Sequence, residues 1–425
     1  MSGPETAIGV MFVTRYSYGG NQGMSSFARR LLSTATLAFA AVLAGTLASP
    51  AAAGAAPAYP TPYTDPFYAA PPDIASKAPG DVLEVRRADT WLAPGNEVWQ
   101  IKYRSTNSSG EPIPAVTTVI KPINSPTDMP VLSYQAIVNS LGLHCAPSAA
   151  LFTGEIKDVF GLPLALAQGW ALAIPDHLGP DSAYGAAKLG GMITLDGVRA
   201  VKRLPELRLS GSPVALAGYS GGGMATAWAA ALNPTYAPDV QLAGVAQGGV
   251  PASIEEMALG LGLADRHPGF GLGFAAAVGL EREYPDRLPL GDQLSPAGIA
   301  LRDELRDECR TLIIAKGLLH SVSGVAKSTD LIRDERVRAV MRENSLVDYP
   351  GVPTAPVFMW HGASDELTPF RSVAATAGRY CKAGATLEFH AYPIAEHMTN
   401  AAVGLPAAFM YLKDRFAGLP APSNC

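Results

Sequence analysis

Short apolar runs recur along the chain from about residue 95 to residue 395, and segments with a helical pattern lie between several of them. The first two runs, Val98–Arg104 and Val116–Lys121, flank a turn-rich link, which predicts an antiparallel hairpin. Further strand candidates are Pro130–Ile137, Trp170–Pro175, Val214–Ala217, Leu242–Ala246, Val357–Trp360 and Leu387–Tyr392. Helical stretches near Gly191–Leu204 and Met224–Leu232 separate some of these runs. This alternation predicts an α/β fold, with a mostly parallel sheet and helices on both faces.

One of these strand-to-helix transitions carries a glycine-rich turn around Ser220. The turn reads Gly-Tyr-Ser-Gly-Gly-Gly from 218 to 223, after an apolar run and before an Ala-rich segment. Strand, G-x-S-x-G turn and helix together are typical of a nucleophile elbow, which exposes the serine hydroxyl at the edge of a sheet. The motif alone also occurs in ordinary turns. The context therefore favours Ser220 as a nucleophile without deciding it.

Two later strand candidates are followed by an acid and a histidine. Asp365 comes shortly after the run that ends at Trp360, and His397 comes shortly after the run that ends at Tyr392. Ser, then Asp, then His is the chain order of the α/β-hydrolase catalytic triad. In such a triad the imidazole takes the serine proton, and the carboxylate fixes the imidazole tautomer. The sequence therefore predicts Ser220, Asp365 and His397 as catalytic residues, with the backbone N–H of Gly221 in the oxyanion hole.

Other residues compete for the base and acid positions. His390 lies inside a predicted strand, and His361 lies close to the strand end and to the acid. His267 and His320 fall in an inserted region. Glu366 is adjacent to Asp365, and its side chain should point in another direction.

The strand–helix alternation stops between residues 251 and 347. This stretch contains Met257–Leu280, in which apolar residues are spaced by glycines. Its position between nucleophile and acid is where this fold accepts cap insertions. We expect a mobile lid in which Phe270 and Phe274 help to bind substrate. A static helical cap that completes the core is the alternative.

The N-terminus has the layout of a secretory signal peptide. Arg29 and Arg30 precede an uncharged stretch, Leu31–Ala48, and small residues follow it. This pattern favours a cleaved signal, and therefore a secreted protein, over a membrane anchor, and Met24 is a plausible start for such a signal. The predicted organisation is an N-terminal extension and signal peptide (1–53), a flexible lead-in (54–66), a first part of the core (67–250), the cap insertion (251–347) and a second part of the core (348–425).

Composition excludes some functions. The chain has 425 residues, of which 48% are hydrophobic and 16% charged, so a sizeable core is expected. A net charge of −5 without a basic run argues against a nucleic-acid partner. Neither a phosphate-binding loop nor a Cys/His cluster with metal-ligand spacing occurs, so we expect no metal and no cofactor.

The four cysteines are an even number, which in an exported chain suggests two disulfides. We favour the pairings Cys145–Cys309 and Cys381–Cys425 over the two other pairings. The second bond would hold the C-terminal tail, which would otherwise fray. Buried free thiols are the alternative.

Taken together, these motifs resemble the secretory lipase family of fungi and actinobacteria, in which the Candida antarctica lipase A-type enzymes are found. The matching stretches are Cys-Ala-Pro-Ser at 145–148, Pro-Asp-His-Leu-Gly-Pro at 175–180, Leu-Asp-Gly-Val-Arg-Ala at 195–200, the turn around Ser220, and His-Gly at 361–362 leading to Asp365. The resemblance covers roughly residues 95–400. It implies an α/β-hydrolase fold with a cap, no metal requirement, and hydrolysis of carboxylic esters including acylglycerols. It also implies a structural role for Asp176 and His177.

At one position the chain departs from the pattern of that family. Ahead of Cys-Ala-Pro-Ser the family usually carries an acidic residue that is thought to complete the oxyanion hole, and Asn139 stands there in this chain. An asparagine amide donates a hydrogen bond without needing to be protonated. We therefore expect Asn139 to serve in the oxyanion hole, with a changed pH profile or rate.

These observations predict a secreted serine esterase or lipase that acts on a lipid or small ester through an acyl-enzyme intermediate, with transient contact at a lipid interface. An acyltransferase with the same triad and a non-catalytic α/β-hydrolase that binds a ligand are the alternatives. A binding protein has no need of all three triad residues, which favours an enzyme.

Overall fold

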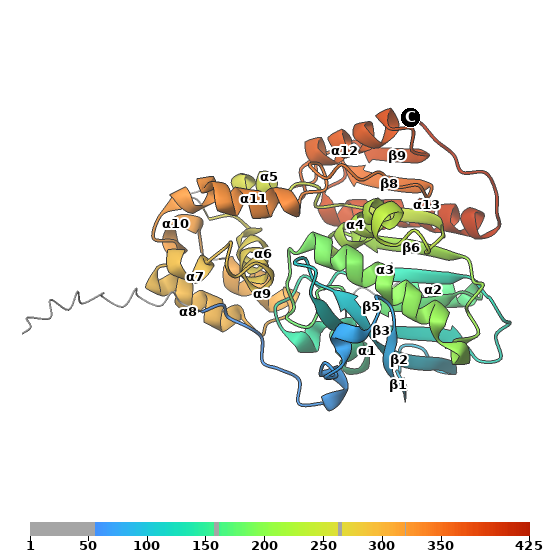
Figure 1. The fold of residues 1–425 in the computed structure, drawn as a ribbon. Helices are drawn as coiled ribbons and strands as arrows, with labels where there is room; N and C mark the ends of the chain where they lie inside the picture. The colour runs from blue at the N-terminus through green and yellow to red at the C-terminus, as the bar shows by residue number, and fades with distance from the viewer. Residues whose placement is uncertain (1–55, 157–160, 262–265, 319) are drawn as a thin grey trace, which may run out of the picture. The chain divides into compact units, whose positions relative to one another are not determined.

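A nine-stranded sheet forms the centre of the computed structural model, which describes residues 56–156, 161–261, 266–318 and 320–425 (Figure 1). The strands are β1 Val82–Ala88, β2 Asn96–Thr106, β3 Pro112–Pro122, β4 Val131–Gln135, β5 Ala171–Pro175, β6 Val214–Tyr219, β7 Leu242–Gly248, β8 Val357–Gly362 and β9 Leu387–Tyr392. Their order in the sheet is β1-β2-β3-β5-β4-β6-β7-β8-β9. The pairs β1–β2, β2–β3 and β3–β5 are antiparallel, and the pairs from β5 to β9 are parallel. The predicted mostly parallel sheet is confirmed.

Helices cover both faces of this sheet, as the sequence pattern predicts. The helices flanking the sheet are α1 Pro147–Thr153, α2 Gly161–Ala167, α3 Ala187–Arg203, α4 Gly221–Tyr236, α12 Phe370–Lys382 and α13 His397–Phe416. Helices α3, α4 and α12 belong to one hydrophobic cluster, and α1, α2 and α13 belong to a second. The 3₁₀ helices are η1 Pro66–Tyr68, η2 Ile74–Ser76, η3 Leu143–Cys145, η4 Pro205–Leu207 and η5 Thr329–Arg333.

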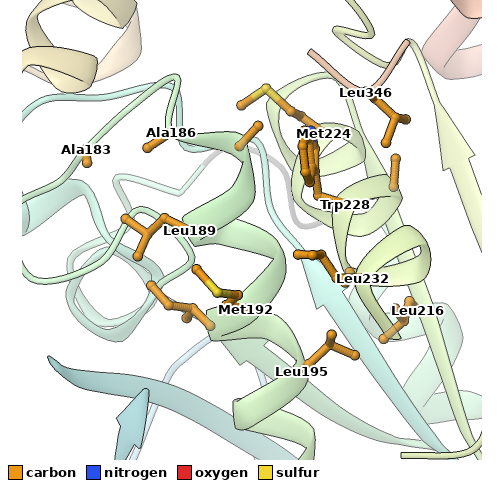
Figure 2. Close-up of a cluster of buried hydrophobic side chains, with 14 of the residues drawn as sticks. Ala183, Ala186, Leu189, Met192, Leu195, Leu216, Met224, Trp228, Leu232 and Leu346 are labelled. Carbon is orange, nitrogen blue, oxygen red and sulfur yellow. The ribbon is translucent and has the colours of Figure 1, made fainter. Parts of the chain in front are cut away.

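The packing of α3 against α4 fixes the helix that begins beside Ser220. Figure 2 shows buried apolar side chains of the two helices: Leu189, Met192 and Leu195 from α3, and Met224, Trp228 and Leu232 from α4. The helices approach closely at Gly191, where a Cβ atom would lie 2.9 Å from Leu232 Cδ1. Trp228 is fully buried. Burying a large apolar side chain contributes about 1.5–3 kcal/mol, so this contact anchors α4 firmly. Because α4 starts at Gly221, the anchored helix also sets the direction of the preceding turn.

The segment between β7 and β8 is helical. Its helices are α5 Ile254–Gly260, α6 Phe270–Glu283, α7 Leu290–Gln293, α8 Pro296–Leu305, α9 Arg310–Gly317, α10 Val322–Val325 and α11 Glu335–Glu343 (Figure 1). They occupy the stretch predicted as the cap insertion, and we call them the cap helices. The Cα atoms of α6 and α9 approach closely where Gly271 meets Gly317. Whether part of this segment moves as a lid stays a prediction.

The N-terminal part of the core differs from the sequence-based expectation in two ways. Strand β1 was not anticipated, because its sequence mixes charged and apolar residues at an edge of the sheet and no residue of it is fully buried. The lead-in from residue 56 to 66, expected to be flexible, makes specific contacts with the cap and with the core. Thr61 donates two hydrogen bonds to Asp307, and the Tyr63 hydroxyl donates to the Leu143 carbonyl. Such bonds hold the segment in place.

The predicted signal peptide lies outside the described residues. Within the described ranges, no helix is both long and apolar enough to cross a membrane.

Candidate active site

Ser220 occupies a tight turn between β6 and α4. Its backbone has φ 54° and ψ −123°, a strained conformation for a residue with a side chain. A Cβ atom on Gly218 would lie 2.4 Å from the Gly222 oxygen, and one on Gly222 would lie 1.9 Å from the Gln135 oxygen. Glycine at both positions therefore lets strand and helix pass close to the turn. Ser220 is 8% exposed, and its hydroxyl reaches the end of the sheet.

His397 and Asp365 lie beside this serine. His397 Nε2 is 2.9 Å from Ser220 Oγ, and His397 Nδ1 is 2.7 Å from Asp365 Oδ2. Asp365 follows β8, and His397 begins α13 after β9. Parallel strands end at the same edge of a sheet, which explains how residues 177 positions apart meet. A Ser–His–Asp chain of hydrogen bonds is the arrangement that activates a serine hydroxyl.

The loop after β8 fixes the Asp365 carboxylate. Its Oδ1 atom accepts hydrogen bonds from the backbone N–H groups of Leu367 at 3.0 Å and Thr368 at 2.8 Å. Burial works to raise the pKa of Asp365, but the hydrogen bonds from His397 and Thr368 outweigh it and lower this pKa. Asp365 is therefore ionised near neutral pH, with Oδ2 available to the imidazole N–H.

The structure gives each competing residue a partner of its own. His361 is buried, and its Nε2 atom lies 2.9 Å from the Thr368 carbonyl oxygen and 3.7 Å from Asp365 Oδ2. His390 pairs with Glu388 at 3.0 Å. Glu366 accepts a hydrogen bond from the backbone N–H of His397 at 3.0 Å, so it touches the main chain of the histidine. The two histidines of the cap insertion contact other cap residues. His267 accepts a hydrogen bond from the Gly269 N–H, and His320 lies near the Phe270 ring.

Asn139 lies beside the first residue of α4. Its backbone is in the left-handed region with φ 46°, and it is 5% exposed. A Cβ atom on Gly221 would lie 1.8 Å from Asn139 Oδ1, so the absence of a side chain at 221 makes room for the carboxamide. The N-terminus of a helix and a nearby amide group are both sources of N–H donors. The two residues predicted for the oxyanion hole therefore lie together next to Ser220.

Bonds to the cap hold the loop that carries Asn139. The Leu141 N–H donates to the Glu308 carbonyl at 3.0 Å, and the Arg310 N–H donates to Ser140 Oγ at 3.2 Å. The guanidinium of Arg282, which is 3% exposed, donates to the Leu141 carbonyl at 2.8 Å and to four other backbone carbonyls. Burial lowers the pKa of Arg282 to about 10, which still leaves it charged near neutral pH. No sequence pattern indicates this contact.

A cavity of about 240 Å³ extends from the serine into the cap. Ser220 and Asn139 line it on the side of the core, and apolar residues of α5 and α6 line it on the side of the cap. Phe270 and Phe274 are among these residues and are 2% and 6% exposed. Their rings stack at 5.7 Å between centroids. A mostly apolar cavity next to a nucleophile suits an apolar group of a substrate.

Both predicted disulfides are present. Cys145 bonds to Cys309, which joins the loop after Asn139 to the start of α9. Cys381 bonds to Cys425, which holds the C-terminal tail against α12. Among the described residues, His144 with Cys145 and Cys309 has the spacing of a metal-ligand group, but both sulfurs are in the disulfide.

Asp176 is bonded to the start of α1. Its carboxylate accepts hydrogen bonds from the Ser148 N–H at 2.8 Å and the Ser148 hydroxyl at 2.5 Å. Burial raises the pKa of Asp176 to about 7. These bonds anchor the first turn of α1, which agrees with the structural role inferred from the resemblance.

Comparison with known proteins gives one consistent result. A family model described as "Secretory lipase" matches residues 149–424. Lipase A of Moesziomyces aphidis is 32% identical over 408 residues, which cover 91% of this chain and 87% of that protein. A secreted triacylglycerol lipase of Malassezia furfur is 32% identical over 383 residues, which cover 85% of this chain and 77% of that protein.

A solved structure agrees with these sequence matches. The crystal structure of Candida antarctica lipase A in its closed state has a TM-score of 0.79 at 31% identity, covering 87% of this chain and 90% of that one. The family and the fold expected from the motifs are thereby confirmed.

Proposed function

This chain belongs to the secretory lipase family, and we propose that it is a secreted serine esterase or lipase that hydrolyses carboxylic esters, triacylglycerols among them. The observation that carries the proposal is the hydrogen-bonded series Ser220, His397, Asp365 at the end of an apolar cavity. A nucleophile, a base and a group that orients the base are the parts that acyl transfer needs.

Acylation begins at Ser220. His397 Nε2 takes the hydroxyl proton as Oγ attacks the ester carbonyl, and Asp365 keeps the proton of Nδ1 in place. The tetrahedral intermediate collapses when the same Nε2 atom gives its proton to the leaving alcohol. This leaves the acyl group on Ser220. Water then attacks the acyl-enzyme with His397 again as base, which releases the carboxylic acid and restores the serine.

The developing oxyanion needs donors that are already in place. We assign this role to the backbone N–H of Gly221 and the amide of Asn139, which lie side by side next to Ser220. Removing one such donor in related chemistry costs about 3–4 kcal/mol of transition-state stabilisation. The amide is always a donor, so this arrangement does not depend on protonation at residue 139.

The cavity indicates the substrate class. Its lining by Phe270, Phe274 and other apolar side chains of the cap favours a hydrocarbon chain over a charged group. The matched relative from Malassezia furfur is named a secreted triacylglycerol lipase. We therefore assign the cavity to the acyl chain of the ester, and the cap helices that line it to a lid.

A panel of p-nitrophenyl esters from acetate to palmitate, together with a triacylglycerol emulsion, tests the proposal. The expected result is turnover with both substrate types, lost in Ser220→Ala. Adding an alcohol as acyl acceptor distinguishes hydrolysis from acyl transfer. Absence of turnover by the folded wild-type protein with every ester would contradict the proposal.

A further inference from the structure

Tyr219, the residue before the nucleophile, lies between the nucleophile turn and the base. It is 7% exposed. Its ring packs on the His397 imidazole with 5.2 Å between the centroids. On another side it lies against Gly249, where a Cβ atom would come within 2.5 Å of the ring. The end of β6 therefore carries Ser220 outward and a large aromatic ring toward the histidine.

The Tyr219 hydroxyl makes two hydrogen bonds, and their directions are determined. Its O–H donates to the backbone carbonyl of His397 at 2.5 Å, because a carbonyl can only accept. The Asn400 side-chain amide donates to the hydroxyl oxygen at 3.0 Å. The hydroxyl proton therefore points at the carbonyl oxygen of His397. Burial raises the pKa of Tyr219, so the hydroxyl remains a donor at every physiological pH.

A second side chain binds the main chain of His397, at its N–H group. Glu366 accepts the His397 backbone N–H at 3.0 Å. The main chain of His397 is therefore held through its N–H by the loop after β8, and through its carbonyl by the nucleophile turn. The imidazole also bonds to Ser220 and Asp365. Tyr219 differs from Glu366 and Asp365 in that it directly precedes the nucleophile Ser220 in the chain.

We propose that Tyr219 is a positioning residue that keeps the His397 imidazole at hydrogen-bond distance from Ser220 by linking the nucleophile turn directly to the His397 main chain. Any movement of the turn is then transmitted to the base, and the Oγ–Nε2 distance is preserved. A displacement of the base by about 1 Å can cost on the order of 100-fold in rate, so a bond that prevents it acts on catalysis. This inference rests on the proposed function, because it assigns His397 as the base.

The test compares two variants that each lose one buried tyrosine hydroxyl. Tyr219→Phe removes the bond to the His397 carbonyl and keeps the ring. Tyr103→Phe is the matched control: Tyr103 is fully buried, and its hydroxyl donates to the Ile193 carbonyl of α3 at 2.9 Å. Both variants lose a bond from a tyrosine hydroxyl to a helix carbonyl, and Tyr219→Phe also removes the acceptor of the Asn400 amide. The loss of stability is therefore measured for each variant and compared with its loss of activity. The readouts are kcat and KM with p-nitrophenyl butyrate, the second-order rate of labelling by a fluorophosphonate, and Tm.

For Tyr219→Phe we expect about a tenfold loss of kcat with KM within about twofold, and an equal loss in the rate of fluorophosphonate labelling. Tyr103→Phe should keep both rates. Equal kcat and equal labelling rates in the two phenylalanine variants, at similar Tm, would overturn the proposal. Labelling of Ser220 in the wild-type protein would show that the proposed function still holds in that case.

A second variant tests the same hydroxyl through its other hydrogen-bond partner. Asn400→Ala leaves the tyrosine in place but removes the donor that orients its hydroxyl. We expect a smaller loss of kcat than in Tyr219→Phe, and no further loss when the two changes are combined, because both act through one hydroxyl. Additive losses in the double variant would contradict the proposed link.

Discussion

The carboxamide of Asn139 lies against Gly221, so closely that any side chain at 221 would collide with its oxygen atom. The loop that carries Asn139 is bonded to the cap at Glu308 and Arg310 and to the guanidinium of Arg282. The position of the amide therefore depends on contacts between the core and the cap. In the proposed mechanism, these contacts prepare the oxyanion hole before substrate arrives.

Asn139→Ala should reduce kcat by about 100- to 1,000-fold with little change in KM, because an oxyanion donor acts mainly in the transition state. Asn139→Asp is the informative partner, since a carboxyl donates a hydrogen bond only when it is protonated. Its activity relative to the wild type should therefore fall as pH rises through the pKa of the new carboxyl. Initial rates from pH 4 to 9 check this. A ratio of Asn139→Asp activity to wild-type activity that stays constant across that range would show that Asn139 does not serve in the oxyanion hole.

Ser220→Ala and His397→Ala should each lower turnover by several orders of magnitude, and the double variant should be little worse than either. Residues that act as one unit have strongly non-additive effects on rate. Steady-state kinetics with purified, folded protein measure this. Near-normal turnover in His397→Ala would show that the base is misassigned, and His361 or His390 would then have to be tested.

Phe270→Ser and Phe274→Ser should weaken hydrolysis of long-chain esters far more than of acetate or butyrate esters. Both rings line the cavity beside Ser220, and both are buried, so a fall in Tm is expected as well. The chain-length ratio therefore decides the question. Phe67→Ser is the control, because Phe67 is equally buried but packs under Arg86. Equal losses on all chain lengths in the two cavity variants would favour a static cap that only completes the core.

Replacing Cys145 and Cys309 by alanine should destabilise the protein more than replacing Cys381 and Cys425. The first bond spans 164 residues of chain and the second spans 44. In the loop-entropy description this difference corresponds to about 1 kcal/mol, on contributions of about 2–5 kcal/mol each. Urea unfolding of the two double variants measures it. A larger loss from the bond at the tail would mean that native contacts, and not loop length, dominate.

Asp176→Asn should flatten the pH dependence of stability. The pKa of Asp176 is raised to about 7, whereas an unfolded aspartate has a pKa of about 3.9. The folded protein therefore holds this proton more tightly, and its contribution to stability falls as pH rises from about 4 to about 7. Relative to the wild type, Asp176→Asn should gain Tm over that interval. Asp239 offers a control of opposite sign, because the hydrogen bonds from Arg199 lower its pKa. A Tm difference between Asp176→Asn and wild type that does not change with pH would contradict the prediction.

The positions of the strands from β2 to β9 could be inferred from their apolar runs, and the proximity of Ser220, Asp365 and His397 could be inferred because each of them follows such a run. Parallel strands bring such positions to one edge, so chain order alone indicates that they meet. The disulfides could be inferred from the even number of cysteines and the predicted export.

Contacts made by single side chains across long sequence separations could not be inferred. The Tyr219 hydroxyl reaches a carbonyl 178 residues away, and Arg282 binds the carbonyl of Ala58 224 residues away. Neither residue lies in a pattern that separates it from other buried aromatic or charged residues. Strand β1 was missed for a related reason, since an edge strand with mixed polarity lacks the apolar run on which the prediction depends.

The central claim is that Ser220 is a nucleophile activated by His397. Its most direct test is peptide mapping of the protein after exposure to a fluorophosphonate, with Ser220→Ala and His397→Ala treated in parallel. We predict one adduct, on Ser220, in the wild type, none in Ser220→Ala, and strongly slowed labelling in His397→Ala. A folded wild-type protein that takes up no probe, or an adduct that persists in Ser220→Ala, would contradict the account.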